Sequence, residues 1–232
     1  MKRFAILCAL ALASCSSAPV APTPVAQVDE DSFEKVTVRS PAQVCGTIAH
    51  APKFVLDERL FTWGTKLDIK LPKGSLGSVE QKVFSWGMSF KMFDSQKTLV
   101  ASAKQKVFSW GSHIELFDCN GNKFGSIKEN VAKSWTKIST SYELLDAHDQ
   151  KIGASNGRNF LETNFEIVDN QGRRVARLHR GWLNWLGDKW QVETFDRHFD
   201  SRMFMFIGAY KTAVDNARAA ESSDSSSSSS SR

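Results

Sequence analysis

The sequence of 232 residues contains no long hydrophobic run, few cysteines and no block of like charges. Its two apolar stretches of note, Phe4–Leu12 and Met203–Tyr210, are nine and eight residues long. A helix needs about 20 apolar residues to cross a bilayer, so neither stretch is long enough. Lys and Arg number 30 against 25 Asp and Glu, and the two signs are mixed along the chain. This distribution argues against nucleic acid as a partner.

Motifs of catalysis and metal binding are also missing. No histidine has another at a metal-binding spacing, and the sequence contains neither a Gly-x-Ser-x-Gly elbow nor a glycine-rich phosphate loop. The segment 118–122 superficially resembles a calcium loop, but its glycine stands fourth instead of sixth and no glutamate closes it. We therefore expect a protein that is not an enzyme and has no metal site and no cofactor.

The N-terminus has the pattern of a targeting segment. Lys2 and Arg3 precede the apolar stretch Phe4–Leu12, and Leu12-Ala13-Ser14-Cys15 resembles the lipobox of bacterial lipoproteins. That resemblance implies a signal peptide at 1–14, acylation of Cys15 (palmitate and related chains) and a membrane anchor. Ser16, in place of the aspartate typical of inner-membrane retention, favours the outer membrane, on a face that the sequence leaves open. An ordinary secretory signal is the alternative. Cleavage would leave 28 basic and 25 acidic residues, a net charge of +3.

A Pro- and Ala-rich segment follows Cys15, and we interpret it as a flexible tether. Residues 15–44 then comprise the acylated cysteine and the tether. Cys45 and Cys119 lie beyond this segment. In an oxidising compartment these two thiols can form a disulfide. Sequence alone leaves this pairing open, because it does not show whether the two Cα atoms lie within bonding range.

A repeated pattern of one apolar, one polar and one apolar residue dominates the segment 45–220, which we interpret as one domain. Aromatic-rich turns such as Phe84-Ser-Trp-Gly87 precede several repeats, and an aspartate follows four of them. Alternation with period two and a spacing of 23 to 28 residues predict repeated β-hairpins in a closed antiparallel barrel. The predicted strands span 53–62, 65–71, 78–86, 88–94, 98–109, 112–118, 123–130, 134–145, 151–156, 160–168, 173–184 and 189–195.

The alternation stops at Phe199, and the chain becomes apolar on all sides over Met203–Tyr210. Such a segment predicts a helix enclosed by protein, with Asp200 or Ser201 as its cap. A barrel of about twelve strands has a lumen that needs filling. We therefore expect a mostly β fold in which a hydrophobic C-terminal helix forms the core of the barrel. The serine-rich residues 221–232 are expected to be disordered.

The chain resembles the LURP-one-related proteins, within the tubby C-terminal-like and phospholipid scramblase superfamily. The resemblance rests on the Phe-Ser-Trp-Gly hairpins, the turn 117–123, the segment Trp182–Trp190 and the acidic-led helix at 200–216. It implies a twelve-stranded barrel around a central helix, in agreement with the alternation. Scramblases carry an acidic calcium-binding segment before their last helix; here Glu193–Asp200 has interleaved basic residues, so the resemblance does not extend to that site.

One basic run is a candidate for anionic headgroups. On a regular strand Arg173 and Arg177 would share one face and Arg174 and Arg180 the other, and a solvated strand face is the alternative. The sequence favours a non-enzymatic outer-membrane lipoprotein that binds lipid or another amphipathic envelope component. A protein-interaction or structural module that docks on an envelope protein is the second hypothesis. The sequence leaves the ligand and the oligomeric state open.

Overall fold

The computed structural model describes residues 45, 48–60, 62–83, 87–106, 112–134, 137–155, 164–181 and 187–227, all within one compact unit that begins at Pro41. The predicted signal peptide, Cys15 and the tether therefore lie outside the described residues, as do residues 228–232.

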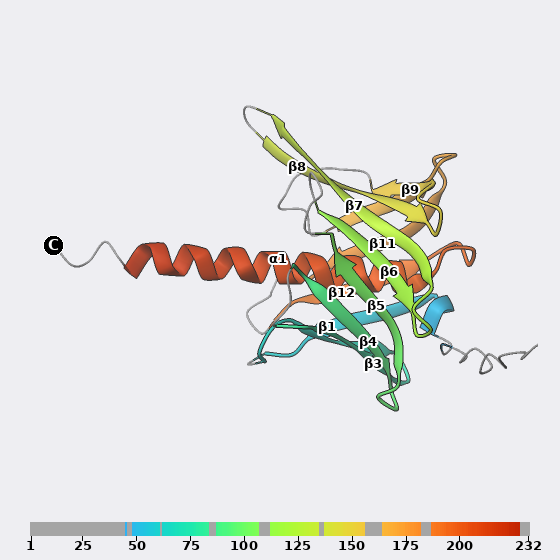
Figure 1. Ribbon diagram of the computed structural model, residues 1–232, viewed down its shortest axis with the longest axis horizontal. Coiled ribbons are helices and arrows are strands. Elements are labelled where there is room, and N and C mark those ends of the chain that lie inside the picture. The colour runs from blue at the N-terminus through green and yellow to red at the C-terminus, as the bar shows by residue number, and fades with distance from the viewer. Residues whose placement is uncertain are drawn as a thin grey trace, which may run out of the picture. The chain divides into compact units, whose positions relative to one another are not determined.

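Twelve antiparallel strands close into a barrel, as the sequence predicts (Figure 1). Each strand pairs with its neighbours in the chain, and β1 closes the barrel by pairing with β12. Closure gives each of the described strands a partner strand on both sides. The strands are β1 (Lys53–Glu58), β2 (Lys66–Leu71), β3 (Gly74–Gln81), β4 (Ser89–Asp94), β5 (Leu99–Gln105), β6 (His113–Asp118), β7 (Lys123–Ser134), β8 (Lys137–Asp146), β9 (Lys151–Ser155), β10 (Asn164–Asp169), β11 (Arg174–Arg180) and β12 (Lys189–Thr194).

The repeated triads place their two apolar residues in the lumen. Leu67 and Ile69 of β2 are both 0% exposed, while Asp68 between them faces outward and pairs with Arg59. The same inward placement holds for the apolar residues of the triads in β4, β6 and β12. Period-two alternation thus gives the barrel an apolar interior and a charged outer surface.

A register shift follows the second apolar residue in five of the six triads, namely those of β2, β4, β6, β8 and β10. In four of these strands an aspartate then opens the turn, and its Oδ1 accepts the backbone N–H groups two and four residues further on. Asp94, for example, accepts from Gln96 (2.9 Å) and Thr98 (2.8 Å). Asp118, Asp146 and Asp169 repeat these contacts. The repeated unit is therefore a strand, a bulge and an aspartate turn.

Helix α1 (Ser201–Ser227) fills the barrel (Figure 1). Asp200 is its cap and accepts the backbone N–H of Arg202 at 2.9 Å. Phe204, Phe206 and Ile207 are 0% exposed, which agrees with the predicted enclosed helix. A Cβ at Gly208 would lie 2.5 Å from the Leu56 side chain, so glycine allows the helix to approach β1 closely. No helix in the described part of the chain is both long and apolar enough to cross a membrane.

Helix α1 ends later than the sequence suggested. The expected disordered tail began at 221, whereas the helix continues to Ser227 and its residues 216–222 are exposed. Each added residue of a helix that already exists gains a backbone hydrogen bond without a new nucleation cost. Ala217, Ala219 and Ala220 also have high helix propensity, which favours continuation beyond the barrel.

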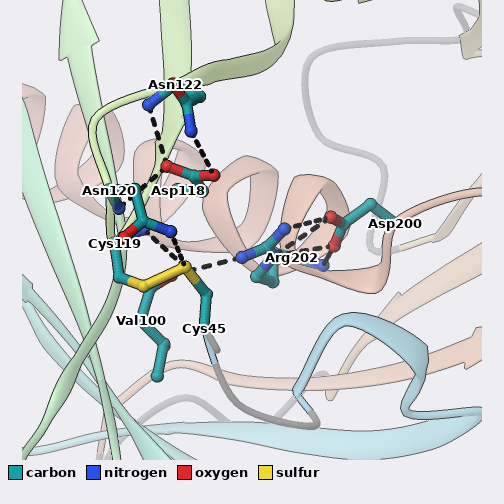
Figure 2. Close-up of a disulfide and its surroundings, with 8 residues drawn as sticks. All are labelled: Cys45, Val100, Asp118, Cys119, Asn120, Asn122, Asp200 and Arg202. Atoms are coloured by element: carbon teal, nitrogen blue, oxygen red, sulfur yellow. Dashed lines mark hydrogen bonds and ion pairs between the residues drawn. A yellow bond between two sulfur atoms is a disulfide. The ribbon is translucent and has the colours of Figure 1, made fainter. Parts of the chain in front are cut away.

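A disulfide joins Cys45 to Cys119 in the turn between β6 and β7, with the two Cα atoms 5.5 Å apart (Figure 2). It attaches the segment before β1 to the barrel end where α1 begins. Nearby, Arg202 forms an ion pair with Asp200 (2.6 Å) and lies over the ring of Phe124. The structure therefore contains the pairing that the sequence left open.

Candidate ligand-binding site

The outer wall of the barrel is covered by ion pairs between neighbouring strands. Lys70 binds Asp57 at 2.6 Å, and Lys151 binds Glu143 at 3.0 Å. Three further pairs of this kind are Lys53–Glu193, Lys66–Glu80 and Lys106–Glu115. Each pair contributes little to stability at an exposed position, but together they make the wall polar. An apolar contact surface must therefore be sought at the ends of the barrel.

Exposed apolar residues gather at one end, which we call the pocket end: it is where β1 connects to β2 and β11 to β12. Leu60 and Val83 are 41% and 45% exposed there, and Trp63 is 87% exposed. Gly64 and Gly187, at the same end, are the glycines of two of the aromatic-rich turns predicted from sequence. The aromatic residues of the segments 84–86, 107–111 and 182–186 lie outside the described residues. Among the described large apolar side chains, only Phe195 is similarly exposed elsewhere, and the Arg174 guanidinium covers its ring.

A pocket of about 570 Å³ opens at the pocket end, beside the point where α1 leaves the barrel. Its wall combines two chemistries. The apolar and small residues are Leu60, Gly64, Met88, Gly187, Ala213 and Ala217, and the polar ones are Glu58, Arg59, Thr62, Thr65, Gln81, Asp188 and Asn216. The volume lies within the range of small-molecule sites, and the mixed wall suits an amphipathic molecule.

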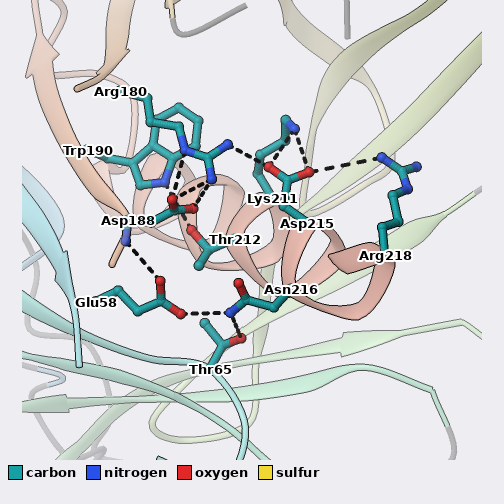
Figure 3. A network of polar contacts seen from close by, with 10 residues as sticks. All are labelled: Glu58, Thr65, Arg180, Asp188, Trp190, Lys211, Thr212, Asp215, Asn216 and Arg218. Carbon is teal, nitrogen blue, oxygen red and sulfur yellow. Dashed lines mark hydrogen bonds and ion pairs between the residues drawn. The ribbon is translucent and has the colours of Figure 1, made fainter. Parts of the chain in front are cut away.

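Glu58 at the end of β1 organises the polar side of the pocket (Figure 3). Its Oε2 accepts the backbone N–H of Asp188 at 2.9 Å, and its Oε1 accepts from Asn216 Nδ2 on α1 at 2.7 Å. Asn216 Nδ2 also reaches Thr65 Oγ1 at 3.4 Å. The backbone N–H of Thr65 in turn donates to Gln81 Oε1 at 3.0 Å. These bonds join α1 to β1, to β3 and to the residues just before β2 and β12, and they fix the direction of the polar side chains.

A charge network supports the same wall from the inside of the barrel (Figure 3). Arg180 of β11 forms a two-point ion pair with Asp188 and binds Asp215 of α1 at 2.6 Å. Its guanidinium lies over Trp190, 5.2 Å from the ring centre. Burial opposes the charge of Arg180, but the hydrogen bonds and charges of Asp188 and Asp215 outweigh it and raise the pKa above its usual value. The helix exit is therefore fixed to the wall by charged contacts that exclude most water.

A second polar cluster lies on another side of α1. Tyr210 donates to Glu129 Oε2 at 2.8 Å and also contacts Ser112 Oγ. Burial raises the pKa of Tyr210 well above its usual value, and the negative charge of Glu129 adds to this effect. The tyrosine hydroxyl therefore stays protonated and acts as a hydrogen-bond donor within the core.

The structure does not assemble the predicted basic run into one surface. The alternation predicts that Arg174 lies on the same strand face as Arg180, and this prediction is wrong. The bulge between β10 and β11 places Arg174 opposite Val168, so that Arg174 and Arg177 both face outward and share Glu166, at 2.9 Å and 3.0 Å. Arg180 instead points toward the charge network of the pocket end.

Arg173 lies just before β11 and binds Asp169 at 2.7 Å. The four arginines thus have carboxylate partners, and three of them are on the outer surface. Sequence reasoning missed Glu58, Thr65, Asp188 and Asn216 as site residues. No local pattern marks them, because the pocket is formed by segments that lie up to 158 positions apart. Among the described residues, no group of three His, Cys, Asp or Glu side chains could hold a metal ion.

A closed antiparallel barrel that its own C-terminal helix enters, with a pocket of mixed chemistry at the helix exit, defines the protein as a helix-filled β-barrel module. The family model for LURP-one-related proteins matches residues 77–209, more than half of the chain. The chain therefore belongs to the LURP-one-related family. A crystal structure of a protein from Arabidopsis thaliana is similar at 13% sequence identity and a TM-score of 0.46, over 72% of this chain and 94% of that one. No curated protein matches the sequence.

Proposed function

We propose that the protein is a non-enzymatic lipoprotein of the outer membrane that binds a lipid or another amphipathic envelope component in the pocket. Membership of the LURP-one-related family supports a lipid-binding type of module, since this family has a tubby-like fold and is not a known enzyme family. The observation that carries the proposal is the pocket itself. It brings apolar and polar side chains together in one cavity, next to exposed apolar side chains.

The anchor is the second part of this proposal. A lipobox-like sequence ending at Cys15 supports acylation, and more than one acyl chain makes attachment to a membrane stable. A domain attached in this way meets lipids and lipid-like molecules at high local concentration.

The test is native mass spectrometry of the full chain, purified with its own N-terminal signal in mild detergent. We expect a co-purifying amphipathic molecule that is lost from Ala217→Trp, a variant whose indole would fill the pocket from the exposed part of α1. Ala219→Trp is the matched control, because Ala219 is equally exposed on α1 but does not line the pocket. Equal ligand content in wild type and Ala217→Trp would refute binding in this pocket.

The alternative is a module that docks on an envelope protein through Leu60, Trp63 and Val83. The exposure of Trp63, at 87%, favours it, because isolated tryptophans at the surface often anchor interfaces. Replacing Trp63 by a photo-crosslinking residue distinguishes the two hypotheses: docking predicts one dominant protein adduct in cells, whereas lipid binding predicts none.

A further inference from the structure

Glu58 differs from Asp188, the other carboxylate that lines the pocket, because it forms no ion pair with a described residue. Asp188 pairs with Arg180, and Arg59 is occupied by Asp68 at 2.6 Å. In the described part of the chain, the Glu58 side chain accepts hydrogen bonds from two neutral groups, the backbone N–H of Asp188 and the side-chain amide of Asn216. The pocket is therefore lined by one carboxylate that has no direct cationic partner among the described residues.

Two neutral donors hold both carboxylate oxygens of Glu58 in a fixed direction, and each oxygen keeps a further acceptor site. Asn216 uses its Nδ2 group for Glu58 and Thr65, which leaves its Oδ1 as an acceptor close by. Glu58 is therefore a directed, negatively charged acceptor, which complements a group that is both a cation and a hydrogen-bond donor.

The pocket is also lined by the apolar side chains of Leu60, Met88, Ala213 and Ala217. It can cover an apolar chain that extends from the cationic group, since burial of each methylene contributes about 0.8 kcal/mol. A quaternary ammonium group has no N–H and so cannot donate a hydrogen bond to Glu58, whereas a primary ammonium group can.

We infer that the pocket selects amphiphiles whose head is a primary ammonium group, bound by Glu58, with the apolar chain along Leu60, Met88 and Ala217. This inference rests on the proposed function and specifies its ligand class. It also differs from the headgroup hypothesis of the basic run, because it predicts preference for a cationic head and assigns the contact to an acidic residue that lines the pocket.

The test is calorimetric titration of the full chain with three single-chain probes below their micelle concentrations: decylammonium chloride, decyltrimethylammonium chloride and sodium decanoate. We expect decylammonium to bind most tightly. Glu58→Gln keeps the size of the side chain but removes its charge. It should weaken decylammonium binding roughly 10-fold to 100-fold, because a hydrogen bond to a charged group contributes more than a neutral one.

Asp57→Asn is the matched control, since Asp57 precedes Glu58 in β1 but pairs with Lys70 on the outer wall. It should bind decylammonium as the wild type does, and circular dichroism should show that both variants are folded. Ala217→Trp should abolish binding of every probe by filling the pocket.

The results test the ammonium preference and the pocket itself separately. If all three probes bind equally and Glu58→Gln binds as the wild type does, the ammonium preference is wrong while the amphipathic pocket stands. If no probe binds, or if Ala217→Trp does not affect binding, the pocket is not the ligand site and the proposed function fails with it.

Discussion

Removal of the Cys45–Cys119 disulfide should destabilise the barrel strongly. The bond closes a loop between residues 74 positions apart in the sequence, so it restricts the unfolded chain over β1 to β6. The chain-entropy relation, with 75 residues in the loop, gives about 15 cal/mol/K, or about 4.5 kcal/mol at 25 °C. In a protein of this size 1 kcal/mol corresponds to about 2–4 °C in melting temperature, so we expect a decrease of about 9–18 °C.

The segment tied down by the disulfide also contributes to the core. Ile48, in the short 3-10 helix Ile48–His50, is 1% exposed, and Ser201 at the start of α1 donates to the carbonyl of Ala51 at 2.9 Å. Release of Cys45 therefore also allows these contacts to open locally, near the start of the central helix.

Differential scanning calorimetry with and without a phosphine reductant measures the effect, with a thiol assay to show that both cysteines are free. The double variant Cys45→Ser, Cys119→Ser should melt at the temperature of the reduced wild type and should not respond to the reductant. A fully reduced wild type that melts within about 3 °C of the oxidised protein would refute the reasoning.

Four further predictions concern the anchor, the core and the outer wall. Cys15→Ala should release the protein from membranes, and sedimentation of this variant with the outer membrane at high salt would contradict acylation at Cys15. Phe206→Asp places an unpaired charge beside the barrel core, where Phe206 is 0% exposed, and should cost several kcal/mol, so a cooperatively melting soluble variant would oppose the central-helix packing. If the basic run recognises anionic headgroups, replacement of Arg174 and Arg177 by Ala should reduce flotation with anionic vesicles. The expected reduction is roughly 30-fold, for two charges at about 1 kcal/mol each. Flotation should not change if the ion pairs with Glu166 already occupy both arginines. Hydrogen bonds from Arg174, and to a lesser extent from Arg177, lower the pKa of Glu166. The contribution of these bonds to folding stability is therefore present above the unfolded-state pKa and is lost as pH falls through the folded-state pKa. NMR titration of the Glu166 carboxyl carbon measures this pKa.

The barrel could be predicted from sequence because its information is local and repeated. In β2, the pair Leu67 and Ile69 encloses Asp68, and the same arrangement recurs along the chain with a turn after each repeat. Since successive side chains of a strand point to opposite faces, the alternation defines the inner and outer faces of each strand. The apolar start of α1 likewise defines a helix that must be enclosed, and the barrel interior is the one place within the same chain that can enclose it.

The orientation of Arg174 could not be predicted in the same way. An unbroken alternation places it on the face opposite Arg177, and only the bulge opposite Ile167 and Val168 moves it to the same side. A bulge depends on how two strands pair, and it shifts every outward residue after it by one position. The end of α1 was misplaced for a related reason: serine content predicts disorder in isolation, but a helix anchored in the barrel extends beyond it at low cost.

The sequence by itself determined the repeat of strand and turn and the enclosed helix, because each of these follows from patterns within about 30 neighbouring residues. Only the tertiary structure decided that Glu58, Asp188 and Asn216 meet at the helix exit and that Cys45 reaches Cys119. These contacts join residues that lie between 74 and 158 positions apart, and their distances depend on barrel closure and on the depth of the helix in the lumen. The pocket is a product of that packing, and therefore no short segment of the sequence encodes it.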